Sequence, residues 1–120
     1  MRFSAVLPAI VTAFVTFTSA HAGQQDFALH NRTGYQIDEV YVSRSSNQNW
    51  GNDVMGNNAL EDGNTVNISF NAPDNACKWD MHVKYNDGDE ATWNSLNLCN
   101  INKVTLFWDK KNQKTRAVTE

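Results

Sequence analysis

The stretch that decides the fold class is residues 77–85, which read Cys-Lys-Trp-Asp-Met-His-Val-Lys-Tyr. Apolar and polar side chains alternate along it, and this period of two is the pattern of a β-strand with one buried face and one solvated face. Asp87-Gly88 follows almost at once and supplies the positive-φ positions of a tight hairpin turn. Residues 91–93 are then expected to return as the antiparallel partner.

Similar patterns occur on both sides of this hairpin. Short runs rich in Val, Ile, Tyr, Phe and Trp recur between clusters of Asn, Asp, Gly and Ser, as in strands separated by turns. These runs predict further strands at residues 26–31, 35–43, 66–70 and 101–108. The apolar positions change phase across Asp38-Glu39, which predicts a β-bulge. Residues 44–63 are mostly polar and predict a long ordered loop or a short edge strand.

Six or seven short strands at turn spacings of about 8 to 12 residues predict a small, Ig-like, two-sheet antiparallel β-sandwich. The chain has 120 residues, which suffices for one small domain with one core. We expect the sandwich to cover residues 23–109. Residues 110–120 are expected to form a polar C-terminal tail that is solvated and frayed.

The N-terminus predicts export. Arg2 precedes a mostly apolar stretch at residues 3–17, and Ala-His-Ala at 20–22 ends it, which is the layout of a cleaved signal peptide over residues 1–22. A membrane anchor is the alternative, but Pro8 interrupts a stretch already shorter than the ~20 apolar residues that a spanning helix needs. We therefore expect a periplasmic or secreted domain, with no membrane span in the mature chain.

The two cysteines, Cys77 and Cys99, both lie in the part of the chain that is expected to be exported, where disulfides form and persist. The predicted hairpin brings the residues after Trp93 back toward the start of the strand at 77–85. We therefore predict a Cys77–Cys99 disulfide. Closing this loop is expected to contribute roughly 3 kcal/mol to stability by the chain-entropy estimate.

Metal sites are not predicted. The mature chain has only His30 and His82 beside the cysteines, and none of the C-x-x-C or H-x-x-x-H spacings of zinc sites. Residues 86–90 offer oxygen ligands of the kind that calcium takes, but their spacing does not match the calcium loop of an EF-hand and the hairpin needs Asp87-Gly88 for its turn. We expect neither a metal nor another cofactor.

Charge and size exclude several classes of function. The chain has 10 Lys and Arg against 13 Asp and Glu, a formal net charge of −3, which gives no electrostatic footprint for nucleic acid. Catalysis also lacks a basis, because no nucleophile motif accompanies the two imidazoles and adjacent strand carboxylates such as Asp38 and Glu39 point to opposite faces. No catalytic residue is predicted.

The segment at residues 47–53, Asn-Gln-Asn-Trp-Gly-Asn-Asp, is the candidate binding site, and we call it the Trp50 loop. It combines an aromatic ring with amide and carboxylate groups, a mixture that can stack on a sugar ring and bond its hydroxyls. The candidate ligand-binding residues are Asn49, Trp50, Asn52 and Asp53. Alternatively, Trp50 plugs one end of the sandwich. The strand residues Trp79, Trp93 and Trp108 are expected in the core.

Several of these segments resemble a family of small exported bacterial β domains. The motifs are Asn-Arg-Thr-Gly-Tyr at 31–35, Ile-Asp-Glu-Val-Tyr-Val-Ser at 37–43, Trp-Gly-Asn-Asp at 50–53, Leu-Glu-Asp-Gly at 60–63, the alternating strand at 66–70, Cys77, Trp79-Asp80 and Leu98-Cys99. The resemblance covers roughly residues 27–109. The chain departs from the family at Arg44, where a proline commonly stands.

Members of that family are often labelled argininosuccinate lyase and have no other established function. The resemblance implies an exported β domain. A true lyase of that name is a large helical tetramer whose active sites draw on several subunits, which a domain of this size cannot supply. We therefore expect a non-catalytic binding or interaction domain with an unknown protein or saccharide ligand. Carbohydrate binding through the Trp50 loop is one alternative, and an enzyme matching the label is another.

Overall fold

The computed structural model describes residues 25–120 except 46, 48 and 71–75, so the predicted signal peptide lies outside the described residues. Its strands are β1 (Phe27–Arg32), β2 (Ile37–Arg44), β3 (Thr65–Ile68), β4 (Lys78–Tyr85), β5 (Glu90–Asn97), β6 (Lys103–Asp109) and β7 (Lys114–Thr119). Within this part of the chain, no helix is long and apolar enough to cross a membrane.

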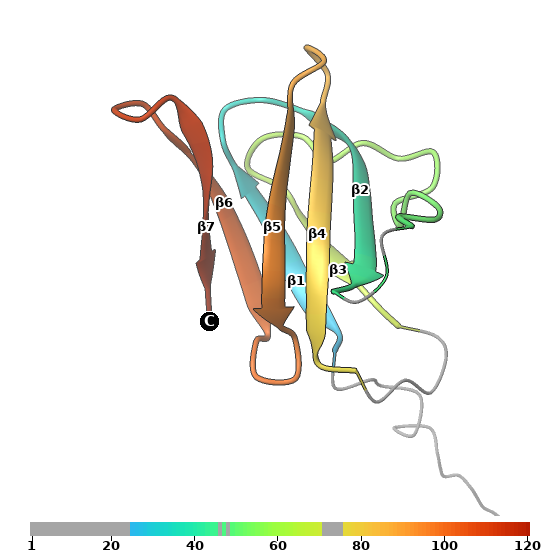
Figure 1. The fold of residues 1–120 in the computed structure, drawn as a ribbon. Helices are drawn as coiled ribbons and strands as arrows, with labels where there is room; N and C mark the ends of the chain where they lie inside the picture. The colour runs from blue at the N-terminus through green and yellow to red at the C-terminus, as the bar shows by residue number, and fades with distance from the viewer. Residues whose placement is uncertain (1–24, 46, 48, 71–75) are drawn as a thin grey trace, which may run out of the picture.

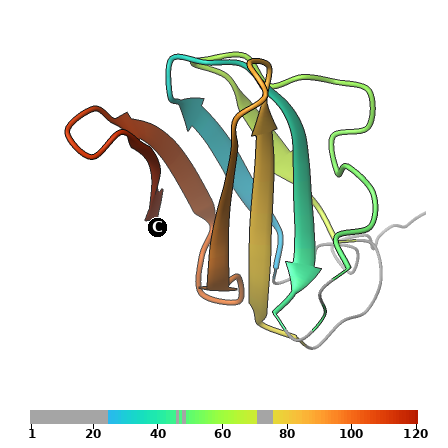
Figure 2. The same cartoon turned by 45° about the horizontal axis from the view of Figure 1, so that its top comes forward.

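The strands form two sheets that pack face to face (Figures 1 and 2). One sheet has the order β3-β1-β6-β7 and the other β2-β4-β5. The predicted all-β sandwich is confirmed, with one exception to its antiparallel pairing, because β1 and β6 run parallel. The strand order also differs from that of an immunoglobulin constant domain, in which the first two strands share a sheet, whereas β1 and β2 lie in different sheets here.

The core lies between the two sheets and follows the predicted alternation. Trp79, Met81, Val83 and Tyr85 of β4 are buried, while the polar residues between them are partly exposed. The fully buried side chains of the core come from both sheets and from the loop ends: Leu29, Ile37, Val40, Met81, Val83, Leu98, Val104 and Leu106. The pairing of β2 with β4 shifts register between Ile37 and Glu39, which confirms the predicted bulge.

Where the structure describes it, the chain between β2 and β3 is a loop, one of the two alternatives predicted for residues 44–63. Its far end is bonded to the start of β2. Ile37 and Leu60 exchange two backbone hydrogen bonds, of 2.9 and 2.8 Å. The fully buried Asn31 donates from Nδ2 to the carbonyl oxygens of Tyr35 and Leu60, at 2.7 and 3.0 Å. This buried amide therefore joins β1 to the β1–β2 connection and to the end of the β2–β3 loop.

Cys77 and Cys99 form a disulfide, as predicted. It joins the residue before β4 to the turn after β5, and Leu98 N–H donates to the Cys77 carbonyl oxygen at 2.8 Å beside it. The bridge thus closes the end of the β4–β5 hairpin opposite the Asp87-Gly88 turn. Gly88 has φ +94° in that turn, a conformation that favours glycine.

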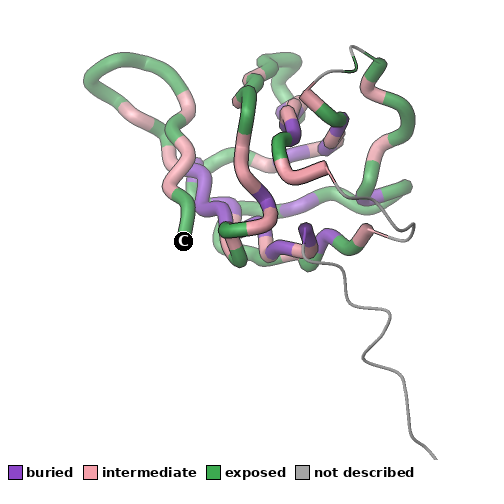
Figure 3. Tube along the Cα trace, turned by 60° about the horizontal axis from the view of Figure 1, so that its bottom comes forward, coloured by how far each residue is buried: buried purple, intermediate pink, exposed green. Residues whose placement is uncertain are grey.

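The prediction of a frayed C-terminal tail is wrong. Residues 114–119 form β7, which pairs antiparallel with β6 from Asp109↔Lys114 to Val104↔Thr119. The strand was missed because an edge strand with one solvated face needs few apolar side chains and tolerates charged ones. Figure 3 shows the outer part of the β6–β7 hairpin largely exposed, beyond the buried centre of the sandwich.

Candidate ligand-binding cleft

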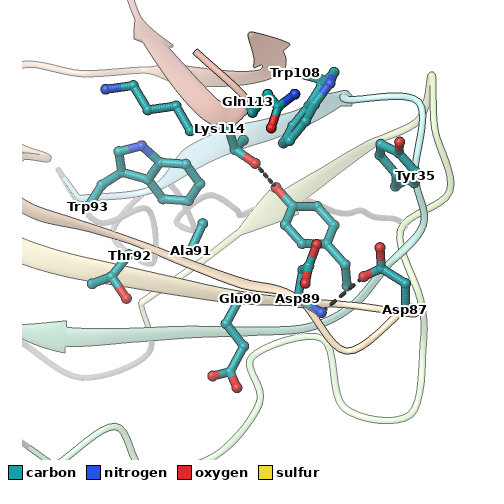
Figure 4. Close-up of a pocket in the computed structure, with 12 residues that line it drawn as sticks. Tyr35, Asp87, Asp89, Glu90, Ala91, Thr92, Trp93, Trp108, Gln113 and Lys114 are labelled. Atoms are coloured by element: carbon teal, nitrogen blue, oxygen red, sulfur yellow. Dashed lines mark hydrogen bonds between the residues drawn. The ribbon is translucent and has the colours of Figure 1, made fainter. Parts of the chain in front are cut away.

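The sandwich is open along one side, where β5 is the edge of one sheet and β7 the edge of the other. A cleft of about 470 Å³ lies there, between β5 and the β6–β7 hairpin (Figure 4). It is lined by Tyr35, Tyr85, Asp87, Asp89, Glu90, Ala91, Thr92, Trp93, Trp108, Gln113, Lys114 and Thr115. The tight β4–β5 turn and the β6–β7 turn thus both contribute to its rim.

A hydrogen bond between the two sheets lies at the base of the cleft. Tyr85 at the end of β4 places its Oη 2.8 Å from the Oγ1 of Thr115 in β7. Burial raises the pKa of Tyr85 above its usual 10.0, and either hydroxyl can be the donor in this bond. The contact ties the projecting hairpin to the core at the base of the cleft.

The walls of the cleft are aromatic. Trp93 is half-buried in β5, and Trp108 near the end of β6 is 37% exposed. Tyr35, from the loop after β1, is 45% exposed and meets Trp108 edge-on with ring centres 6.1 Å apart. Figure 4 shows Trp93 on one side of the cleft and Trp108 with Tyr35 on the other. The cleft therefore presents flat apolar surfaces from both sheets.

The prediction that Trp108 lies in the core is wrong. Trp108 continues the inward phase of Val104 and Leu106, which are fully buried, but it is itself exposed. The reason is its position, since β6 runs past the core and into the projecting hairpin. Trp79 is buried at 7% exposure, as predicted for a core residue, while Trp93 is a half-buried wall of the cleft.

Polar groups stand on the rim. Asp87 and Asp89 come from the β4–β5 turn, where Asp87 Oδ1 accepts from the Asp89 N–H at 2.9 Å. Lys114 and Gln113 come from the opposite hairpin. Among the described residues, no three or more His, Cys, Asp or Glu side chains are grouped so that they could hold a metal ion.

The Glu90 side chain turns away from the cleft in Figure 4. Its Oε1 lies 2.6 Å from Nε2 of His82, whose Nδ1 lies 2.6 Å from Thr92 Oγ1. These three side chains form a row on the outer face of the β2-β4-β5 sheet. Glu90 therefore contributes to the edge of the cleft but directs its carboxylate to the other face.

Trp50 meets this outer face rather than an end of the sandwich. The Trp50 ring stacks on His82 with centres 5.3 Å apart and planes 30° apart. Trp50 is half-buried there, so it is neither the predicted plug nor a fully free platform. The Trp50 side chain is thus held to the sheet by a ring contact and not by burial in the core.

The other candidate residues of the loop have different roles. Asp53 Oδ1 accepts from the backbone N–H groups of Val40 and Met55, at 2.9 and 3.0 Å. The Asn49 carbonyl oxygen accepts from the Ser43 hydroxyl at 3.0 Å, and Asn52 is exposed. None of the four candidates is among the residues that line the cleft. The structure thus gives Asp53 and Asn49 structural contacts and places the loop apart from the cleft.

Comparison with known proteins adds information on the fold. No protein-family model matches the chain, and no curated protein matches it. Among solved structures, it is similar to the NMR structure of a protein from Eubacterium rectale, with 16% identity, 78% of this chain and 85% of that chain covered, and a TM-score of 0.56. The likeness shows the fold alone. Fold and cleft together define a small disulfide-linked β-sandwich with an open aromatic edge.

Proposed function

We propose that this protein is an exported, non-catalytic binding domain that holds a saccharide in the cleft between β5 and the β6–β7 hairpin. The observation that carries the proposal is the pair of exposed rings, Trp108 and Tyr35, beside Trp93 in one cleft. Large exposed aromatic side chains offer flat apolar area with few rotatable bonds, which suits stacking on the C–H face of a sugar ring. The volume of the cleft is also in the usual range of small-ligand sites, roughly 300–1,000 Å³.

The rim provides the hydrogen bonds that a polyhydroxylated ligand needs. The carboxylates of Asp87 and Asp89 accept from hydroxyls, while the Lys114 ammonium donates and the Gln113 amide does both. A mixture of flat apolar walls and a few convergent polar groups is typical of ligand sites. Export is supported by the Cys77–Cys99 disulfide, since such bonds persist in oxidising compartments.

An extended peptide added to the β5 edge is the other ligand that an open sheet edge suggests. This edge is interrupted, because the pairing of β4 with β5 shifts register between Trp79 and Met81. Opposite this shift, Ser95 has φ 58° and its N–H donates to the Asp80 carboxylate at 2.9 Å. Bulges of this kind twist an edge away from further pairing. The observations therefore favour a saccharide over a strand-like peptide.

A glycan array probed with the exported protein, followed by calorimetric titration of the hits, tests the proposal. Trp108→Ala is the site variant, and Trp50→Ala is the matched control because it removes a tryptophan from the other face of the β2-β4-β5 sheet. We expect Trp108→Ala to abolish saccharide binding while Trp50→Ala retains it. If no saccharide binds, the proposal is wrong. If only Trp50→Ala abolishes binding, the site lies in the Trp50 loop instead.

A further inference from the structure

A second hollow adjoins the cleft and shares Trp108 with it. This open hollow of about 600 Å³ lies at the loop end of the β3-β1-β6-β7 sheet. It is lined by Arg32, Thr33, Gly34, Asp62, Gly63, Trp108 and Lys110. Since Trp108 lines both spaces, a ligand stacked on this ring can extend from the cleft into the hollow.

The lining of the hollow has a net positive charge, because it contains two cations, Arg32 and Lys110, and one carboxylate, Asp62. Arg32 ends β1 and is exposed, and its guanidinium carbon lies 5.5 Å from the centre of the Phe107 ring. Such a cation–π contact orients the guanidinium without cancelling its charge. Among the described residues, neither Arg32 nor Lys110 forms an ion pair with a carboxylate. Both cations therefore remain available to an anion.

A third cation, Arg116, lies near Arg32 but is not among the residues that line the hollow. Arg32, Phe107 and Arg116 lie side by side on neighbouring strands, and the Arg116 guanidinium carbon is 5.8 Å from the same ring centre. The carboxylate in the hollow, Asp62, uses Oδ1 to accept from the Gly34 N–H at 2.8 Å. Of the charged residues that line the hollow, the two cations Arg32 and Lys110 thus outnumber the one carboxylate, Asp62, which already accepts a hydrogen bond from a loop.

Charge is consequently divided across Trp108. The rim of the cleft on one side carries Asp87 and Asp89 against one cation, Lys114. The hollow on the other side carries Arg32 and Lys110 against one carboxylate, Asp62. We infer that the ligand is an acidic saccharide, with a sugar ring stacked on Trp108 and a carboxylate or sulfate group in the hollow. Guanidinium groups bind both anions with paired hydrogen bonds. This inference rests on the proposed saccharide function.

Paired glycans that differ only in the anionic group test the inference. One pair is a hexamer of galacturonic acid and its methyl ester, and the other is a sulfated galactan hexasaccharide without uronic acid and its desulfated form, so that one member of each pair is neutral. The variants are Arg32→Gln and Lys110→Gln. Lys78→Gln is the control, because it changes the net charge equally at an exposed position at the start of β4 in the other sheet.

We expect the acidic member of at least one pair to bind about tenfold more tightly than its neutral partner, the effect of one charge-assisted hydrogen bond, and more weakly at high salt. Arg32→Gln and Lys110→Gln should each remove most of this preference, and Lys78→Gln should not. The pair that shows it identifies the anion. Equal binding of acidic and neutral members overturns the inference, while loss of neutral binding in Trp108→Ala would still support the proposed function. If no member binds at all, the proposed function fails first.

Discussion

Tyr85 and Thr115 join the two sheets of the sandwich through one hydrogen bond of 2.8 Å between their hydroxyl oxygens. Tyr85 belongs to β4 in the centre of the three-stranded sheet, and Thr115 belongs to β7 at the edge of the four-stranded one. The bond lies at the base of the cleft, so it couples the hairpin that carries Gln113 and Lys114 to the core. The shape of the proposed binding site thus depends on a contact between residues that are far apart in the sequence.

Removing this hydrogen bond should loosen the hairpin at a measurable cost. Tyr85→Phe keeps the buried ring and deletes only the hydroxyl, so we expect the free energy of unfolding to fall by about 0.5–1.5 kcal/mol in urea melts. Thr115→Val should have a similar effect, and the double variant should cost less than the two single losses together. Tyr35→Phe is the control, with an expected change within about 0.5 kcal/mol because Tyr35 is exposed. Strict additivity would contradict the contact.

The C-terminal strand should be essential for folding. Ending the chain after Asp109 removes β7, which uncovers the β6 edge and leaves its backbone groups unpaired. We expect the shortened protein to unfold or aggregate, as followed by circular dichroism and size-exclusion chromatography. Replacing Lys110 and Lys111 in the turn by Gln should leave the melting temperature nearly unchanged. If the shortened chain melts at the same temperature as the full one, the result would instead support a frayed C-terminal tail.

The disulfide should contribute a large share of the stability. Thiol titration of the denatured, non-reduced protein should find no free thiol, because Cys77 and Cys99 are joined. Replacing both residues by alanine should lower the free energy of unfolding by about 2–5 kcal/mol, the usual range for a native bridge in a small secreted domain. Two titratable thiols per chain would show that the bridge does not form in the purified protein.

Trp50→Ala should cost less than the loss of a core tryptophan. The ring stacks on His82 at the outer face of a sheet, and aromatic pairs contribute about 0.5–1.5 kcal/mol beyond area burial. We expect a loss of about 1 kcal/mol in denaturant melts with an unchanged m-value. Trp79→Ala, at a buried position, should lose about 3–5 kcal/mol and serves as the reference for a core residue. A loss of that size for Trp50→Ala would indicate a plug after all.

Tyr41 should make stability depend on alkaline pH. A hydrogen bond from its Oη to the Glu39 carboxylate raises the pKa of Tyr41 from 10.0 to about 12. The folded pKa lies above the unfolded one, so the stabilisation is complete below about pH 10 and is lost as the pH rises through about 12. The unfolding free energy of the wild type should therefore fall toward that of Tyr41→Phe over this window.

The matched variant for this prediction is Glu39→Gln. It keeps an acceptor for the phenol but removes the charge, so the pKa of Tyr41 should move back toward 10.0. Spectrophotometric titration of the phenols measures this shift directly. A wild type and a Tyr41→Phe protein whose stabilities differ by a constant amount between about pH 10 and 12 would contradict the coupling.

Local patterns in the sequence predict much of this fold. The alternation over residues 77–85, the Asp87-Gly88 turn, the phase change at Asp38-Glu39 and the pairing of Cys77 with Cys99 all agree with the structure. Each of these features depends on residues close together in the chain or on one hairpin. A strand period of two and a positive-φ turn are visible in any short window of sequence, because the side-chain types themselves follow the alternating faces of the sheet.

The residue types of the Trp50 loop do not indicate where the loop lies in the fold. Trp50 with its amide and carboxylate neighbours indicates a ligand site as well as a structural loop, and the two interpretations need different surroundings. Only the tertiary structure places His82 under the Trp50 ring and the Val40 N–H against Asp53. The stacking partner comes from β4, thirty-odd positions further along, so no local pattern could identify it.

What the sequence by itself determined is therefore a disulfide-linked all-β domain with a known hairpin and bulge. The tertiary structure decided the parallel pairing of β1 with β6, the strand at residues 114–119 and the exposure of Trp108. Trp108 has the same phase as the buried Leu106, so the sequence pattern treats the two alike. They differ because β6 continues past the edge of the core, and where one sheet outruns the other is set by the packing of strands that are distant in the sequence.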